Sequence, residues 1–122
     1  MSDALFVNQH ELKIAMKYLG MKKKEKMLDK VGILVVTMGK QGSEISTPSG
    51  TLSISAIKPR KVLDPTGAGD AYRAGFYAGL SRGLDLEVCG RIGASAACFA
   101  IEVRGPVGKL PSWNEARERA GL

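Results

Sequence analysis

The stretch Asp-Pro-Thr-Gly-Ala-Gly-Asp, residues 64–70, combines two carboxylates with a run of small residues. It follows a short apolar run and precedes a segment with helical spacing. Small residues at the start of a helix allow backbone N–H groups to point together at the positive end of the helix dipole, where anions bind. The spacing therefore predicts an anion-binding loop with the Asp70 carboxylate fixed beside it.

Two interpretations of Asp70 stay open on the residues alone. A carboxylate in the first turn of a helix interacts favourably with the helix dipole and needs no further role. Beside an anion site, the same carboxylate could accept a proton from a hydroxyl group that attacks a phosphate. The Gly-Ala-Gly run does not decide between these two roles.

Further polar residues follow two apolar runs of the chain. Asn8 and Glu11 come after a short run near the N-terminus, at the spacing of a helix capping box. Thr37 ends the run Ile-Leu-Val-Val-Thr, and Gly39 and Gly42 behind it indicate a turn. On the residues alone, these are the start of a helix and the end of a strand.

Five short strands are predicted to position these residues. The run 33–37 is continuous and β-branched, which is typical of a strand buried on both faces of a parallel sheet. Alternating residues around Thr-Pro-Ser-Gly predict a hairpin of strands 43–46 and 51–57. Residues 4–7 and 61–63 are the other two candidates.

Helical spacing covers most of the remaining chain. The predicted helices span residues 11–19, 23–30, about 70–82, about 86–103 and 113–120. Strand, helix, strand, hairpin and then helices indicate an α/β layered fold. A length of 122 residues leaves room for a single domain.

Composition excludes several classes of protein. Hydrophobic residues make up 44% and charged residues 25%, values of an ordinary globular chain and not of a disordered one. No apolar stretch approaches the roughly 20 residues of a membrane helix, and no secretory signal is visible. Cys89 and Cys98 lie in one predicted helix, roughly 13 Å apart, too far for a disulfide. We therefore expect two buried thiols in a reducing, cytoplasmic protein.

The net charge of +6 is concentrated in one segment. Residues 10–30 contain seven lysines and three acids, which leaves +4 there. The segment has no arginine and only Tyr18 as an aromatic residue, so it lacks the stacking platforms of single-strand binders. A solvated helical face is the favoured interpretation, with an anionic or nucleic-acid surface as the alternative.

The stretch from Asp64 to Phe76, Asp-Pro-Thr-Gly-Ala-Gly-Asp-Ala-Tyr-Arg-Ala-Gly-Phe, closely resembles the C-terminal signature of the PfkB (ribokinase-like) family of sugar and nucleoside kinases. Its Tyr-Arg-Ala-Gly-Phe ending is most similar to archaeal nucleoside kinases, whereas many sugar kinases have Asn in place of Arg73. Residues 8–11 match the family's Asn-x-x-Glu motif, and residues 36–42 match its nucleotide-loop pattern. The Gly- and Ala-rich helix leading to residues 103–106 also fits, so the resemblance covers essentially the whole chain.

The resemblance implies a role for each matching residue. Asp70 matches the catalytic base, and the backbone of Gly67, Ala68 and Gly69 matches the anion hole for the transferring phosphoryl group. Asn8 and Glu11 match the pair that acts through Mg²⁺ and its waters on the phosphates of ATP. The positions that match the nucleotide lining are Thr37, Gly39 and Gly42. Asp64 and Thr66 match a monovalent-cation site, for K⁺ in the members that have one, together with carbonyls near Arg104 to Pro106.

The resemblance also implies a fold and a boundary. We expect the C-terminal part of a ribokinase-like fold, with a parallel-type central sheet, a β-hairpin and flanking helices. Complete family members are more than twice this size, and their N-terminal half supplies the lid and most acceptor-binding residues. Residues 1–122 are therefore expected to be the ATP-binding, catalytic portion of a kinase for a sugar or nucleoside.

Alternative functions stay open beside the kinase. One is a nucleotide-binding remnant without turnover, and a less favoured one is a basic nucleic-acid-binding protein. No membrane or nucleic-acid partner is expected. We expect a homo-oligomer, because a sheet without its neighbouring strands exposes an edge that recruits another chain.

Overall fold

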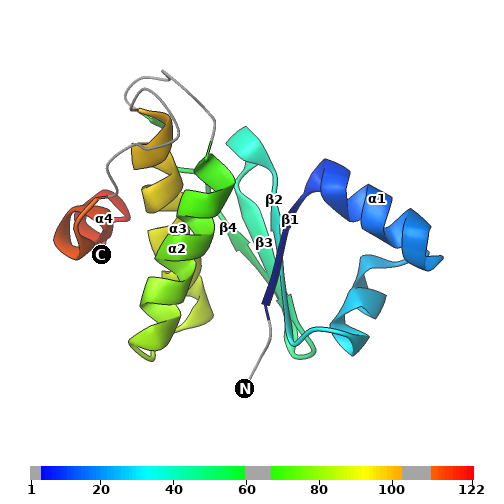
Figure 1. Ribbon diagram of the computed structural model, residues 1–122. Helices are drawn as coiled ribbons and strands as arrows, with labels where there is room; N and C mark the ends of the chain where they lie inside the picture. The colour runs from blue at the N-terminus through cyan, green and yellow to red at the C-terminus, as the bar shows by residue number, and fades with distance from the viewer. Residues whose placement is uncertain (1–3, 60–66, 103–110) are drawn as a thin grey trace. The chain divides into compact units, whose positions relative to one another are not determined.

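The computed structural model describes residues 4–59, 67–102 and 111–122, in two compact units, 1–54 and 55–122. The first unit holds a four-stranded sheet in the order β1-β2-β3-β4 (Figure 1). Its strands are β1 (Ala4–Asn8), β2 (Ile33–Thr37), β3 (Ser43–Thr47) and β4 (Gly50–Ile54). β1 and β2 are parallel, and the pairs β2–β3 and β3–β4 are antiparallel. The sheet is therefore mixed, and the predicted α/β class is confirmed.

β2 is the buried centre of this unit, as its β-branched run predicts. Leu34 and Val35 have no exposed surface, although successive residues of a strand face opposite sides of the sheet. On one side, Leu34 and Val36 pack with Leu12 and Met27 in an apolar core. That core attaches α1 (Gln9–Leu19) and the 3₁₀ helix η1 (Lys24–Asp29) to the sheet (Figure 1).

Both ends of α1 are set by local sequence. Asn8 and Glu11 form the predicted capping box at its start. Gly20 ends the helix in the left-handed conformation, with φ at 68°. A residue with a side chain rarely adopts this conformation, so glycine is the natural stop signal.

The lysine-rich helix predicted over residues 23–30 is instead the short 3₁₀ helix η1. In an α-helix over these residues, Lys26 and Lys30 would repel each other at a spacing of four residues. Lys23 at its start provides no side-chain cap. Tertiary contacts hold the segment in place, through the Met27 side chain in the core and a 2.9 Å ion pair between Lys24 and Glu44 of β3.

The hairpin forms as predicted, but β4 ends at Ile54 and not at residue 57. Ile54 is opposite Ser43, the first residue of β3. Beyond Ile54 there is no residue of β3 left to pair with, so the alternating pattern continues without a strand. The strand predicted over 61–63 lies outside the described residues.

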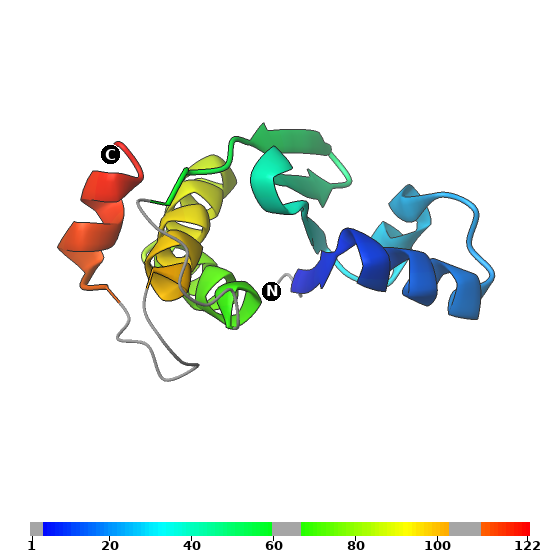
Figure 2. The same cartoon turned by 90° about the horizontal axis from the view of Figure 1, so that it is seen from above.

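The second unit contains α2 (Ala68–Ser81), α3 (Leu86–Ile101) and α4 (Trp113–Arg119), close to their predicted bounds. Helices α2 and α3 lie side by side (Figures 1 and 2). Gly75 of α2 and Gly93 of α3 mark the closest approach. A Cβ on Gly75 would lie 2.9 Å from the Ile92 carbonyl oxygen, and one on Gly93 would lie 2.9 Å from that of Tyr72.

Three arginines attach α4 to the other two helices. Arg82 lies 3.9 Å above the Trp113 ring, and Arg91 donates a 2.8 Å hydrogen bond to the Ala120 carbonyl at the end of α4. Arg119 pairs with Glu102 at 2.6 Å, and this hydrogen bond raises the pKa of the guanidinium. Each contact bridges helices distant in sequence, so α4 is a fixed part of this unit.

Cys89 and Cys98 of α3 are free and buried, as predicted. Burial raises the pKa of both thiols. They therefore remain protonated at neutral pH and pack as small apolar groups. Within the described ranges, none of the helices combines the length and the apolar character that crossing a bilayer requires.

Ser95 in α3 is fully buried, and its hydroxyl has no hydrogen-bond partner in the described structure. Replacing Ser95 by alanine removes this unsatisfied group and improves helix propensity, so we expect stability to rise by about 1 kcal/mol. Denaturant unfolding of both proteins measures the change. The control is Ser81→Ala, because the exposed Ser81 hydroxyl donates to the Ala78 carbonyl at 3.1 Å. A loss of stability in Ser95→Ala would show that the hydroxyl makes a favourable interaction.

Candidate functional site

The carboxyl ends of β1 and β2 bring together the predicted residues of the first unit. Asn8 and Thr37 are register partners on these parallel strands, and the Thr37 hydroxyl donates to the Val7 carbonyl at 3.5 Å. Figure 1 shows the start of α1 and the turn after β2 at this same end of the sheet. Ligands of α/β proteins bind preferentially at the carboxyl ends of parallel strands.

The turn after β2 contains two glycines that need their conformational freedom. The 3₁₀ turn η2 (Gly39–Gln41) begins with Gly39 at φ 58°, and Gly42 follows it at φ 93°. The chain reverses here to enter β3, and the Met38 N–H donates to the Gly42 carbonyl at 2.8 Å. The predicted nucleotide residues Thr37, Gly39 and Gly42 thus form one continuous strand end and turn.

Asn8 and Glu11 hold each other through two hydrogen bonds. The Glu11 N–H donates to Asn8 Oδ1 at 2.7 Å, and the Asn8 N–H donates to Glu11 Oε1 at 2.9 Å. The capping role is therefore confirmed. Glu11 is exposed, and this box uses only one of its two carboxylate oxygens. The pair is compatible with Mg²⁺, which takes oxygen ligands, keeps several waters and needs only one or two protein carboxylates.

The described residues do not form a site in which several protein side chains together ligate a metal ion. Among residues 4–59, 67–102 and 111–122, no group of three or more His, Cys, Asp or Glu side chains is arranged to hold a metal ion. Asp64, Thr66 and the segment from Arg104 to Pro106 lie outside the described residues.

The N-terminal turn of α2 holds the predicted residues of the second unit. Gly67 precedes the helix at φ 87°, and its carbonyl accepts the first helical hydrogen bond, 2.9 Å from the Ala71 nitrogen. The N–H groups of Ala68, Gly69 and Asp70 therefore have no acceptor within the helix. The N-cap residue, Gly67, has no side chain with which to cap this end, in contrast to the capping boxes of α1 and α4.

Asp70 is the third residue of α2 and is exposed. A carboxylate here lies within one helical turn of the N–H groups that precede it. Gly69 has ordinary backbone geometry, and a Cβ built on it meets no described atom within 4 Å. The left-handed conformation expected of the loop thus belongs to Gly67. The turn therefore places backbone N–H groups without a helical acceptor next to an exposed carboxylate, and chemically such an arrangement can bind an anion and accept a proton beside it.

The structure brings the predicted residues together within each unit: five at the strand ends of the first, and Gly67 to Asp70 in the second. One charged residue at the strand ends, Lys40, lies outside the predicted set. Its place in Gly-Lys-Gln-Gly, within the stretch 36–42 that matches the nucleotide-loop pattern, is the signal that the sequence offers for it.

Comparisons with known proteins agree on one family. Residues 1–113 match the family model described as pfkB family carbohydrate kinase. The chain is 45% identical over 118 residues to a nucleoside kinase of Methanocaldococcus jannaschii, covering 97% of this chain and 39% of that protein. It is 39% identical over 122 residues to a nucleoside kinase of Methanothermobacter thermautotrophicus, covering 96% and 37%. The chain thus spans about two fifths of the length of these relatives.

Solved structures give the same result. The crystal structure of the M. jannaschii nucleoside kinase, described as an archaeal member of the ribokinase family, superposes with a TM-score of 0.93 at 44% identity. The match covers 98% of this chain and 40% of that one. The nucleoside kinase of Burkholderia thailandensis in complex with inosine gives 0.89 at 31% identity, covering 96% and 38%.

Proposed function

The chain belongs to the pfkB family of carbohydrate kinases, and we propose on this basis that it carries the nucleotide site and the catalytic base of an ATP-dependent phosphotransferase. The acceptor is an alcohol group of a nucleoside or sugar. The N-terminal turn of α2 is the observation that carries the proposal, because it joins backbone N–H groups that have no acceptor within the helix to the exposed carboxylate of Asp70.

Each group at this turn has a defined task in the proposed reaction. Asp70 accepts the proton of the acceptor hydroxyl as its oxygen attacks the γ-phosphorus of ATP. The bond from that phosphorus to the β,γ-bridging oxygen breaks, and ADP leaves with the electron pair. The backbone N–H groups of Gly67, Ala68 and Gly69 stabilise the charge on the phosphoryl oxygens. Little covalent work is left to the protein, because phosphoryl transfer depends mainly on positioning and electrostatics.

The strand ends of the first unit supply the nucleotide side. We propose that Thr37, Gly39 and Gly42 line the nucleotide and that Asn8 and Glu11 act on its phosphates through Mg²⁺ and waters. When bound, Mg²⁺ neutralises phosphate charge. The geometry that supports this is the common strand edge, where Asn8 and Thr37 are paired. Asp64 and Thr66 remain proposed ligands of K⁺, on the resemblance alone.

Among acceptors, a nucleoside is favoured, because the two relatives at 45% and 39% identity are both named nucleoside kinases. A nucleotide-binding module without turnover is the second candidate. We also propose a cytoplasmic location and self-association, the latter because β1 is one of the two outer strands of the described sheet.

Replacing Gly69 by valine tests the anion site. A Cβ at this position has no described atom within 4 Å, so we expect the variant to fold with nearly unchanged stability. The valine methyl groups occupy the space where phosphate approaches the N–H groups, so affinity for Mg–ATP should fall at least about tenfold, or ~1.4 kcal/mol. Calorimetric titration with ATP measures this.

The matched control for Gly69→Val is Ala74→Val, an exposed position one turn further along α2. It introduces valine into the same helix without blocking its N-terminus, so ATP affinity should stay at the parent value. Unchanged affinity in a folded Gly69→Val protein would show that the residues before Asp70 form only a turn.

A further inference from the structure

Lys40 is an exposed residue within η2, at the carboxyl end of β2. We infer that its ammonium group is a further nucleotide-binding group, which contacts the phosphates of the bound nucleotide. The inference rests on the proposed function, because it deepens the assignment of the strand ends of the first unit. The predicted nucleotide residues of this unit are a hydroxyl and two glycines, so none of them supplies positive charge.

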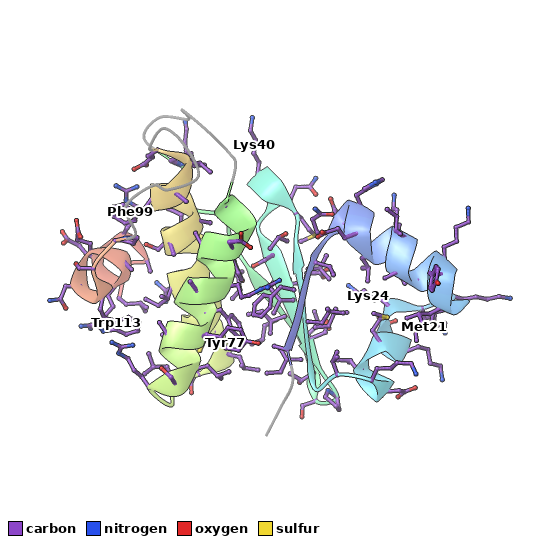
Figure 3. All side chains as sticks on the ribbon, viewed as in Figure 1. Met21, Lys24, Lys40, Tyr77, Phe99 and Trp113 are labelled. Carbon is purple, nitrogen blue, oxygen red and sulfur yellow. The ribbon has the colours of Figure 1, made fainter. Side chains whose placement is uncertain are left out.

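The backbone around Lys40 is held by its own hydrogen bonds. The Gln41 N–H donates to the Met38 carbonyl at 3.1 Å, and the Gly42 N–H donates to the Gly39 carbonyl at 3.1 Å. With the 2.8 Å bond from Met38 to Gly42, three bonds close this turn. The turn therefore fixes the point from which the Lys40 side chain leaves the backbone, and Figure 3 shows the side chain extending from η2 beyond the strand ends.

Lys40 is also uncommitted among the charges of the described residues. The ion pairs there are Lys24 with Glu44 and Arg119 with Glu102, and neither involves Lys40. The other lysines of the first unit lie in or next to α1 and η1, between residues 13 and 30. Lys40 therefore stands apart from the lysine-rich segment, as a single cation at the edge that carries Asn8 and Thr37.

A lysine in this position suits phosphate better than the other parts of a nucleotide. An ammonium group binds phosphate as a point charge with three donors. Adenine and ribose carry no charge, so the contribution of Lys40 should depend on the number of phosphates. That dependence distinguishes direct contact from a general effect of the turn on its neighbours.

The test is calorimetric titration of parent and Lys40→Met proteins with ATP, ADP, AMP and adenosine in the presence of Mg²⁺. We expect Lys40→Met to weaken ATP about tenfold, AMP less, and adenosine not at all. Lys40→Arg should retain most of the ATP affinity, because the charge remains. The control is Lys30→Met, which removes an exposed lysine from the lysine-rich segment and should leave the affinities for all four ligands unchanged.

Each result has a defined meaning. Equal losses for ATP and adenosine would overturn the inference, since they would show a structural effect on the turn. Unchanged ATP affinity in Lys40→Met would overturn it while leaving the proposed nucleotide site intact. A parent protein that binds none of the four ligands would overturn the proposed function itself, and the inference with it.

Discussion

Replacement of Asp70 by asparagine is expected to lower the rate of phosphoryl transfer by about 10²- to 10⁴-fold, the contribution typical of a general base. Asparagine keeps the shape of the side chain and its place in the first turn of α2, but it cannot accept the proton of the acceptor hydroxyl. Affinity for ATP should stay nearly unchanged, because none of the proposed phosphate contacts is made by the Asp70 side chain. The expected signature is therefore a loss of turnover without a loss of nucleotide binding.

Two measurements separate this outcome from a folding defect. The first is the rate of ADP release with a nucleoside acceptor, measured on a catalytically active protein that contains residues 1–122. The second is a titration of the same protein with ATP, which measures nucleotide affinity. The matched control is Glu87→Gln, the same chemical change at an exposed position in the first turn of α3. Turnover of Asp70→Asn within a factor of about three of the parent, where a base contributes at least about 10², would remove Asp70 from the catalytic role.

Local signals explain why most elements could be predicted from the sequence. The continuous β-branched run gave the bounds of β2, and the pair of Asn8 and Glu11 marked the start of α1. Predictions failed where the deciding contact was distant in sequence. η1 is shaped by its anchors to the core and to Glu44, and β4 ends where its partner strand begins.

The candidate site was predictable in a different way. The resemblance to the PfkB family, confirmed by the comparisons, supplied the residues, and physical reasoning alone left Asp70 and the Asn8–Glu11 pair open between two roles. Only the structure could show that Gly67 adopts the left-handed conformation and that the capping box uses one of the two Glu11 carboxylate oxygens. The assignments of Asp64 and Thr66 stay predictions.

Helix α3 packs against the turn of α2 that carries Asp70, and no sequence motif indicates this contact. Gly93 of α3 lies against the backbone of α2 at Tyr72, only two residues after Asp70. A Cβ on Gly93 would be 2.9 Å from the Tyr72 carbonyl and 3.1 Å from two atoms of its ring. Backbone cannot move aside as the end of a flexible side chain can, so the two helices would have to separate.

Gly93→Val is therefore expected to cost about 3 kcal/mol or more, at the upper end of overpacking effects. For a unit of this size that loss lowers the midpoint of thermal unfolding by about 10–20 °C. Differential scanning calorimetry measures it, and Gly69→Ala is the control, because glycine is replaced within a helix at a position with no described atom in reach. Helix propensity favours alanine, so the control should be as stable as the parent or slightly more so. A Gly93→Val protein with the parent midpoint would show that α2 and α3 do not pack this closely, and that α3 does not fix the turn that carries Asp70.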